Sequence, residues 1–309
     1  MTVPAPVRLG LALPQFGRFA GAWALVTVAR EAEAEGFDSL WVGDRLMTPL
    51  APKDRYPGGD GKIPPAHRTF LDPFAVMATA AAVTTRVRLG SSALNANWYA
   101  PALLARSLAT IDQLSGGRLD VGLGLGWSSE EYAAVGASWQ GRAARLDATL
   151  DALETIWRDD PVVLTDERWT IPPSHIFPKP AQLPHPPVYL AGFAPPALDR
   201  IGRRADGWLA ASMPISVLTG MWKIVKEAAE RKGRDPDALR IVMRANPIIV
   251  DSPADAALPR SGTVRQIADH LSAAAESGVH EIFLDLQHTA QGPRHLLDLA
   301  GELRQASGL

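Results

Sequence analysis

The stretch Arg118-Leu-Asp-Val-Gly-Leu-Gly-Leu-Gly-Trp-Ser-Ser-Glu-Glu-Tyr132 is an apolar strand that breaks into alternating glycines and then meets a tryptophan and two carboxylates. Gly122, Gly124 and Gly126 fall on one face of an extended chain, because successive strand residues point to opposite faces. A flat ligand can lie against such bare backbone. Small residues also let a strand enter a crowded barrel interior, and the glycines alone do not separate these two interpretations.

This segment belongs to an alternation of strand and helix patterns that runs along the whole chain. The first strand pattern is Val7 to Leu13, and an Ala-rich helical pattern from Trp23 to Glu35 follows it and ends at Gly36. The other expected strands are Ser39 to Val42, Val87 to Ser91, Leu119 to Leu123, Val188 to Ala191, Gly207 to Ala211, Arg240 to Ala245 and Glu281 to Leu286. We therefore expect an α/β fold, a (β/α)8 TIM barrel that forms a single domain over residues 1–309.

The alternative topology is an open doubly wound sheet. It needs a glycine-rich phosphate fingerprint after the first strand, and Leu13-Pro-Gln-Phe-Gly17 is not one.

Two segments account for the length beyond the roughly 250 residues typical of such a barrel. Met47 to Leu71 is an extended loop after strand 2, long enough to cover an active site, and Arg55, Tyr56 and His67 are its most chemically useful residues. A purely structural flap is equally consistent with this loop. Pro161 to Pro187, after helix 4, predicts a hairpin insertion. We expect the hairpin to serve subunit contact or rim packing, and the chain to form a homodimer.

Composition excludes several classes of protein. With 47% apolar residues the chain can build one large core, and no apolar run is long enough to cross a bilayer. With a formal charge of -2, the chain lacks the excess positive charge that nucleic-acid-binding proteins carry. The basic runs at 200–204 and 226–234 have acidic neighbours, which is typical of solvated helices. The absence of cysteine and of a secretory pattern at Met1 to Arg8 predicts a cytoplasmic protein. The histidines lack metal-ligand spacing, so we expect no metal site.

Chemistry in parallel barrels lies at the carboxyl ends of the strands, so the residues that follow each strand are the candidates. These are Asp44 and Arg45 after the second strand, Ser92 and Ala93 after the third, Gly124, Gly126, Trp127 and Glu130 after the fourth, and Ala191, Gly192, Phe193 and Ala194 after the fifth. The last group leads into Pro195-Pro196 at a helix start, where an anion can bind; because these prolines have no N–H, the donors must be Gly192, Phe193 and Ala194. Pro-Pro is also simply a good helix opener. Glu130 can act as an acid if its pKa is raised, but acidic residues commonly open helices without any catalytic role.

Several sequence blocks together resemble the luciferase-like flavin and deazaflavin oxidoreductases. They are Phe37-Asp-Ser-Leu-Trp-Val-Gly-Asp44, Thr84-Thr-Arg-Val-Arg-Leu-Gly90, Leu108 to Arg118, Gly122 to Trp127, Phe177-Pro-Lys-Pro180 and Ala205-Asp-Gly-Trp208. The loop Asp54-Arg-Tyr-Pro-Gly-Gly-Asp-Gly61, followed by Asp72-Pro73, is similar to the branch assigned to coenzyme F420.

The resemblance implies a cofactor ring over the strand ends and a non-proline cis peptide that falls at Ser92–Ala93. It places Asp44, Ser92, Ala93, Gly124, Gly126, Trp127 and Glu130 at the ring and its ribityl chain, and Gly192, Phe193 and Ala194, which follow Ala191, at the phosphate. Two positions depart from the family. Arg45 stands where many relatives carry a histidine that in some of them takes part in proton transfer, and arginine cannot act as a general base. Ala194 stands where relatives often carry serine.

We therefore expect an oxidoreductase that transfers a hydride between C5 of F420 and a small organic substrate, with Asp44, Arg45 and Glu130 as the catalytic candidates. Reduction of a carbonyl or activated double bond, or oxidation of an alcohol, fits this chemistry. The alternatives are an FMNH2-dependent monooxygenase that uses O2, with FMN in place of F420, and a non-catalytic flavin-binding barrel. An aldolase or hydrolase barrel lacks support, because neither a metal cluster nor a Schiff-base lysine follows a strand.

Overall fold

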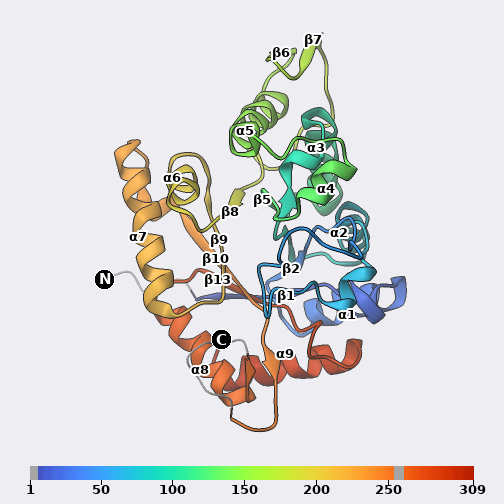
Figure 1. Ribbon diagram of the computed structural model, residues 1–309, viewed down its shortest axis with the longest axis vertical. Coiled ribbons are helices and arrows are strands. Elements are labelled where there is room, and N and C mark those ends of the chain that lie inside the picture. Colours follow the sequence, from blue (N-terminus) through green and yellow to red (C-terminus); the bar gives the residue numbers. More distant parts are fainter. Residues whose placement is uncertain (1–5, 254–260) are drawn as a thin grey trace.

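A closed barrel of eight parallel strands forms the centre of the molecule (Figure 1), and the computed structural model describes it over residues 6–253 and 261–309. The strands are β1 (Arg8–Ala12), β2 (Ser39–Val42), β3 (Arg88–Ser91), β5 (Leu119–Gly124), β8 (Val188–Ala191), β9 (Gly207–Ala211), β10 (Arg240–Ala245) and β13 (Glu281–Leu284). They pair in the order β3-β2-β1-β13-β10-β9-β8-β5, and a β3–β5 pairing closes the ring. All the expected strands and the barrel topology are confirmed. Residues 1–5 and 254–260 of the expected single domain lie outside the described residues.

Helices surround this barrel as an outer layer (Figure 1). They are α1 (Ala22–Ala34), α2 (Pro73–Val83), α3 (Pro101–Ser115), α4 (Ser129–Ala134), α5 (Arg142–Arg158), α6 (Pro195–Arg204), α7 (Ile215–Arg231), α8 (Val264–Glu276) and α9 (Pro293–Ser307). Both the short α4 and the long α5 lie in the fourth crossover. No helix in the described ranges is long and apolar enough to span a bilayer.

The two expected insertions are present. Residues 47–71 form an irregular segment whose one regular turn is the 3-10 helix Pro65–Arg68, and we call it the lid segment. The hairpin of β6 (Val162–Thr165) and β7 (Thr170–Ser174) follows α5 and projects at one end of the molecule (Figure 1). Exposed apolar side chains in this insertion include Val163, Phe177 and Leu183. A role of the hairpin in subunit contact stays a prediction.

Short pairings complete the secondary structure. β4 (Leu94–Asn95) pairs with β5 at the carboxyl end of the barrel, and β11 (Ile248–Ile249) pairs with β12 (Ser261–Gly262).

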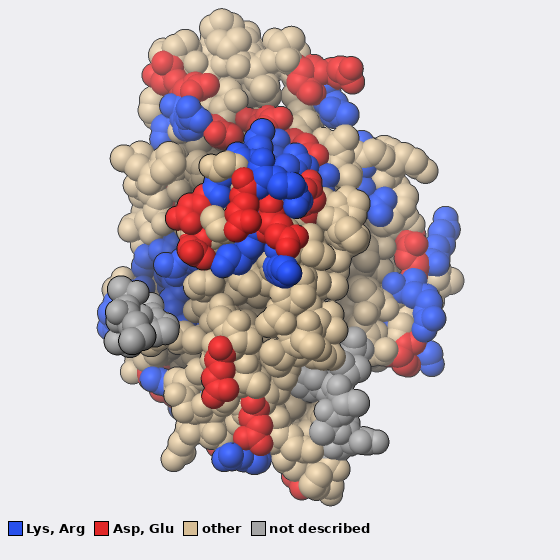
Figure 2. Space-filling view, turned by 90° about the vertical axis from the view of Figure 1, so that its left-hand side faces the viewer, with Lys and Arg blue, Asp and Glu red and all other residues tan. Residues whose placement is uncertain are grey.

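The outer face of α6 and α7 carries charges of both signs side by side (Figure 2). Asp199 pairs with both Arg203 and Arg231, and Lys226 pairs with Asp237. Acidic partners therefore stand beside several cations of the two basic runs, as expected for solvated helices.

The middle of the barrel is filled by side chains that point inward. Ala12, Trp41, Tyr189, Leu209, Val242 and Phe283 form a separate buried cluster there. The rings of Trp41 and Phe283 stack at 4.8 Å. A Cβ on Gly122 would lie 1.7 Å from the carbonyl oxygen of Ser91, so crowding alone requires glycine at position 122. Of the two interpretations of Gly122, packing is the one that the structure supports.

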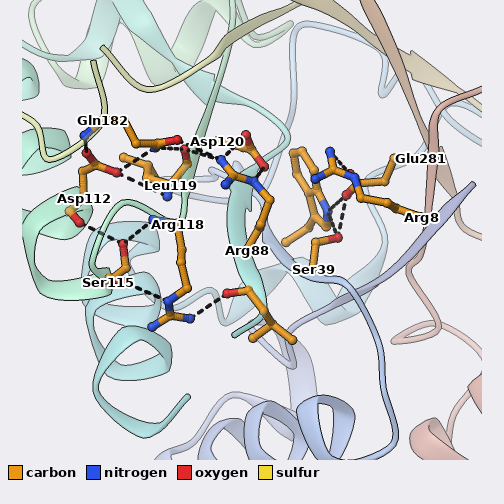
Figure 3. Close-up of polar contacts among 12 residues, drawn as sticks. Arg8, Ser39, Arg88, Asp112, Ser115, Arg118, Leu119, Asp120, Gln182 and Glu281 are labelled. Carbon is orange, nitrogen blue, oxygen red and sulfur yellow. Dashed lines mark hydrogen bonds and ion pairs between the residues drawn. The ribbon is translucent and has the colours of Figure 1, made fainter. Parts of the chain in front are cut away.

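Buried ion pairs close the amino-terminal end of the barrel (Figure 3). Arg88 binds the Asp120 carboxylate through Nε at 2.6 Å and Nη2 at 2.7 Å. Arg8 contacts Glu281 at 2.5 Å, and the hydroxyl of Ser39 donates to the same carboxylate. These charges lie opposite the strand ends where a ligand site is expected, so their role is to hold the barrel closed.

We expect Asp120→Asn to destabilise the protein by about 3 kcal/mol, because Arg88 would keep its largely buried charge without a charged partner. Urea unfolding measures this difference. The control is Glu154→Gln, which breaks the exposed Arg158 pair and should leave the midpoint unchanged. Equal effects of the two substitutions would show that the Arg88–Asp120 pair does not hold the barrel.

Candidate functional site

Small residues line one side of the carboxyl-terminal mouth of the barrel. A Cβ on Gly124 would lie 3.3 Å from the Ala93 Cβ and 3.4 Å from the Ala191 Cβ, so these three residues are neighbours. Ala93 and Ala191 rest on the buried aromatic cluster inside the barrel. We call Ala93, Gly124 and Ala191 the mouth floor. Ala93 and Ala191 are half-buried and Gly124 is buried between them, so this side of the mouth carries no side chain larger than a methyl group, which suits a planar ring.

The peptide bond between Ser92 and Ala93 is cis, as the family resemblance implied. The Ser92 N–H donates to the carbonyl of Val42 at 2.7 Å, which ties this turn to the end of β2. Gly126 has a φ of +62°, and a Cβ there would lie 2.5 Å from Asn95 Nδ2. Gly126 is therefore a turn glycine at the exposed rim, which separates its role from that of Gly124.

Asp44 stands at the end of β2 and is held from two sides. Its Oδ2 accepts hydrogen bonds from the Asn95 N–H and the Tyr99 hydroxyl, each at 3.0 Å. Burial raises the pKa of the Asp44 carboxyl to about 7 despite these two bonds, and the negative charge of Glu131 adds to the rise. Asp44 is therefore able to give or take a proton near neutral pH.

Arg45 is fixed against the start of α4. Its Nε lies 3.0 Å from Glu131 Oε1, and its guanidinium lies 4.5 Å from the ring centroid of Trp127. Glu131 is buried and also accepts the Leu46 N–H at 2.8 Å. Arg45 Nη1 is buried without a partner among the described residues. Arg45 is therefore a fixed guanidinium whose charge Glu131 balances, and it cannot serve as a base.

Of the two adjacent carboxylates, Glu131 and not the expected Glu130 contacts Arg45. Glu130 accepts the Lys53 N–H at 3.1 Å on the exposed side of the lid segment, while Glu131 carries the contact with Arg45. Both carboxylates lie in the first turn of α4, where adjacent residues point in different directions. Which of them meets Arg45 depends on where residues 45–53 lie, and the sequence does not give that. A catalytic role of Glu130 stays a prediction.

The lid segment is attached to the barrel mouth at both of its ends. Asp54 Oδ2 accepts the backbone N–H of Ser129 at 2.7 Å and its hydroxyl at 2.5 Å. Tyr56 contacts the Trp127 ring edge-on at 5.4 Å. At the other end, Gln15 Nε2 donates to the carbonyl of Leu71 at 2.8 Å. The lid segment therefore lies across the mouth, where it can exclude water.

His67 of the lid segment lies in a cluster of aromatic rings that joins this segment to the barrel. Phe16, Tyr56, Phe70 and His288 all lie within ring contact of it. Burial lowers the pKa of His67 to about 3, and His288 and Arg45 lower it further. At neutral pH this wall is uncharged and largely apolar, and its rings meet His67 edge-on or tilted.

A second arginine at the mouth was not expected from the sequence. Arg244 near the end of β10 forms an ion pair with buried Asp285. Gln287 donates to Asp285 through Nε2 at 3.1 Å and accepts the Gln15 N–H at 2.7 Å. The alternation along the strand could have indicated Arg244, because Val242 faces the barrel interior and residue 244 points to the same side.

The turn from β8 into α6 is open to solvent at Phe193 and Ala194. A Cβ on Gly192 would lie 2.6 Å from the Ala197 Cβ, so glycine is needed for the tight entry into α6. The side chain of Ala194 makes no cap, and Pro195 begins the helix. The turn can therefore offer backbone N–H groups to an anion.

The chain is similar in sequence and in fold to known proteins. A family model described as luciferase-like monooxygenase matches residues 18–294. An uncharacterized protein of Mycobacterium tuberculosis is 32% identical over 203 residues, which cover 63% of this chain and 72% of the relative. An F420-dependent glucose-6-phosphate dehydrogenase of Amycolatopsis mediterranei is 31% identical over 222 residues, which cover 69% of this chain and 62% of the relative. The structure of the monooxygenase RslO1 from Streptomyces bottropensis superposes with a TM-score of 0.77 at 20% identity, covering 97% of this chain and 98% of the other.

We expect the stability of the protein to fall between about pH 4 and pH 7 through Asp44, because the folded protein holds this carboxyl protonated over that range and the unfolded chain does not. Asp44→Asn stays neutral at every pH. Its free energy of unfolding should therefore rise relative to the wild type across this window and then level off. Urea unfolding at pH 4, 5.5, 7 and 8 tests this, and a difference independent of pH would contradict the raised pKa.

Proposed function

We propose that this protein is an oxidoreductase that transfers a hydride between coenzyme F420 and a small organic substrate. The proposal starts from the family, because the chain belongs to the luciferase-like monooxygenases. One observation carries the proposal: the mouth floor lies at the strand ends together with the Asp44 carboxyl, whose pKa is about 7. The similarity to an F420-dependent dehydrogenase favours the deazaflavin over FMN.

The residues present fit such a cofactor. A Cβ on Gly124 would press against the Ala93 Cβ at 3.3 Å, so glycine keeps the mouth floor free of larger side chains, and the turn at Gly192, Phe193 and Ala194 suits a phosphate. Arg45 and Trp127 would border the ring. When bound, the deazaflavin supplies a hydride acceptor or donor at C5.

Asp44 supplies the proton that balances the hydride. In carbonyl reduction the hydride, with its electron pair, goes to the carbonyl carbon, and the protonated Asp44 carboxyl gives its proton to the oxygen. In alcohol oxidation the Asp44 carboxylate accepts that proton. Tyr99 and Asn95 keep the carboxyl in place, and the lid segment keeps water away from the reacting atoms.

Titration of the purified protein with F420 and with FMN, followed by tryptophan quenching, tests the cofactor choice. We expect micromolar binding of F420. Gly124→Val should abolish it, because the added methyl groups would occupy the mouth floor, whereas Gly301→Ala, with open space around it, is the matched control and should bind normally. Binding of FMN without F420 would overturn the proposal in favour of the FMNH2-dependent monooxygenase.

The proton role of Asp44 makes a separate prediction about pH. Reduction of a carbonyl substrate, found with a panel of ketones and aldehydes, should lose rate as the pH rises through about 7, because Asp44 must be protonated. Asp44→Asn should lower kcat by about 100-fold or more while F420 still binds. Stopped-flow oxidation of reduced F420 measures both, and an unchanged pH profile in the variant would remove Asp44 from the proton step.

A further inference from the structure

Arg244 crosses the mouth of the barrel beneath the lid segment. β10 and β3 stand on opposite sides of the eight-stranded ring, yet Arg244 Nη1 reaches the carbonyl of Ser92, which follows β3, at 3.4 Å. Its side chain is 33% exposed, whereas that of its partner Asp285 is fully buried. Arg244 is therefore the member of the pair that a ligand entering the mouth from solvent meets first.

Arg244 also holds hydrogen-bonding capacity that the protein does not use. It lines a cavity of about 10 Å³, room for one atom of the size of a water oxygen, together with Gln15, Asp285 and Gln287, among others. The side chains of Gln15, Asp285 and Gln287 all have partners, but Arg244 Nε is buried without one among the described residues. A buried N–H without an acceptor is costly, and the bond from Nη1 to Ser92 is long enough to be exchanged.

The charges around Arg244 decide which acceptor fits. Asp285 neutralises Arg244, and Glu131 neutralises Arg45. His67 and His288 have pKa values lowered by burial and carry no charge at neutral pH. The mouth therefore has no net positive charge with which to hold a buried carboxylate or phosphate, whereas a neutral carbonyl oxygen fills the free N–H without adding a charge.

The cavity admits only the oxygen atom of a ligand, and aromatic rings surround it. Phe16 and Phe70 are stacked at 5.4 Å and both line the cavity, and Trp41 and Phe283 lie beneath it. Resting on the proposed function for the reaction itself, we infer that the substrate is a planar, uncharged carbonyl compound whose oxygen accepts hydrogen bonds from Arg244. Negative charge that develops on this oxygen during hydride transfer would lie against the guanidinium.

Three probes of similar size test the assignment: acetophenone, ethylbenzene and benzoate. Each is titrated into the full-length protein with and without oxidised F420, and tryptophan fluorescence gives the affinity. We expect acetophenone to bind about tenfold tighter than ethylbenzene, because one hydrogen bond to a charged group distinguishes them, and benzoate to bind more weakly than acetophenone. The infrared carbonyl stretch of bound acetophenone should shift to lower frequency.

Variants separate this role from a structural one. Arg244→Met combined with Asp285→Asn removes the pair without leaving a buried charge, and it should abolish the preference for acetophenone and the infrared shift while ethylbenzene binds as before. Asp285→Asn alone should raise the affinity for benzoate, since Arg244 then keeps an unbalanced charge. Arg204→Met, on an outer helix paired with Asp151, is the control and should change neither.

The outcomes distinguish this inference from the cofactor proposal. Equal binding of acetophenone and ethylbenzene, or tightest binding of benzoate to the wild type, would overturn the carbonyl assignment even if F420 binds. A double variant that loses F420 but keeps its preference for acetophenone would assign Arg244 to the cofactor instead. If the wild type prefers acetophenone through Arg244 but binds no F420, the assignment of Arg244 stands and the cofactor proposal falls.

Discussion

A planar ligand can enter this barrel only where the inward side chains at its carboxyl end are almost absent, and that constraint organises the rest of the molecule. From one end of the barrel to the other, the inward positions pass from ion pairs, through the aromatic cluster around Trp41 and Phe283, to the mouth floor of Ala93, Gly124 and Ala191. The lower layers hold the cylinder closed and filled. Large inward side chains are therefore lacking only at the end of the barrel where the carboxyl ends of the strands present polar groups.

The mouth combines several ionisable groups with little net charge. Both arginines are paired with carboxylates, burial holds His67 neutral, and it raises the pKa of Asp44 to about 7. For the proposed reaction, a neutral, enclosed mouth of this kind suits transfer of a hydride to an uncharged molecule, because no fixed charge must be desolvated during the step. Asp44 is then the group whose protonation changes within the working range of pH.

The strands and the hairpin were predictable because their signals are local. Alternation of apolar residues, the helix stop at Gly36 and the runs around Asp166-Glu167 all act within a few residues. The site was only partly predictable. Arg45 meets Glu131 across 86 residues of sequence and Arg244 meets Asp285 across 41, so no local pattern distinguishes them from surface charges. The glycines show the same limit: Gly122 serves packing, Gly124 belongs to the mouth floor and Gly126 makes a turn, although all three look alike in the sequence.

A crystal structure of the protein soaked with oxidised F420 tests the central claim most directly. The account predicts that the deazaflavin ring lies on Ala93, Gly124 and Ala191, with its phosphate at the turn of Gly192 to Ala194. A ring bound away from the mouth floor, or a mouth floor covered by protein side chains in the complex, would contradict it.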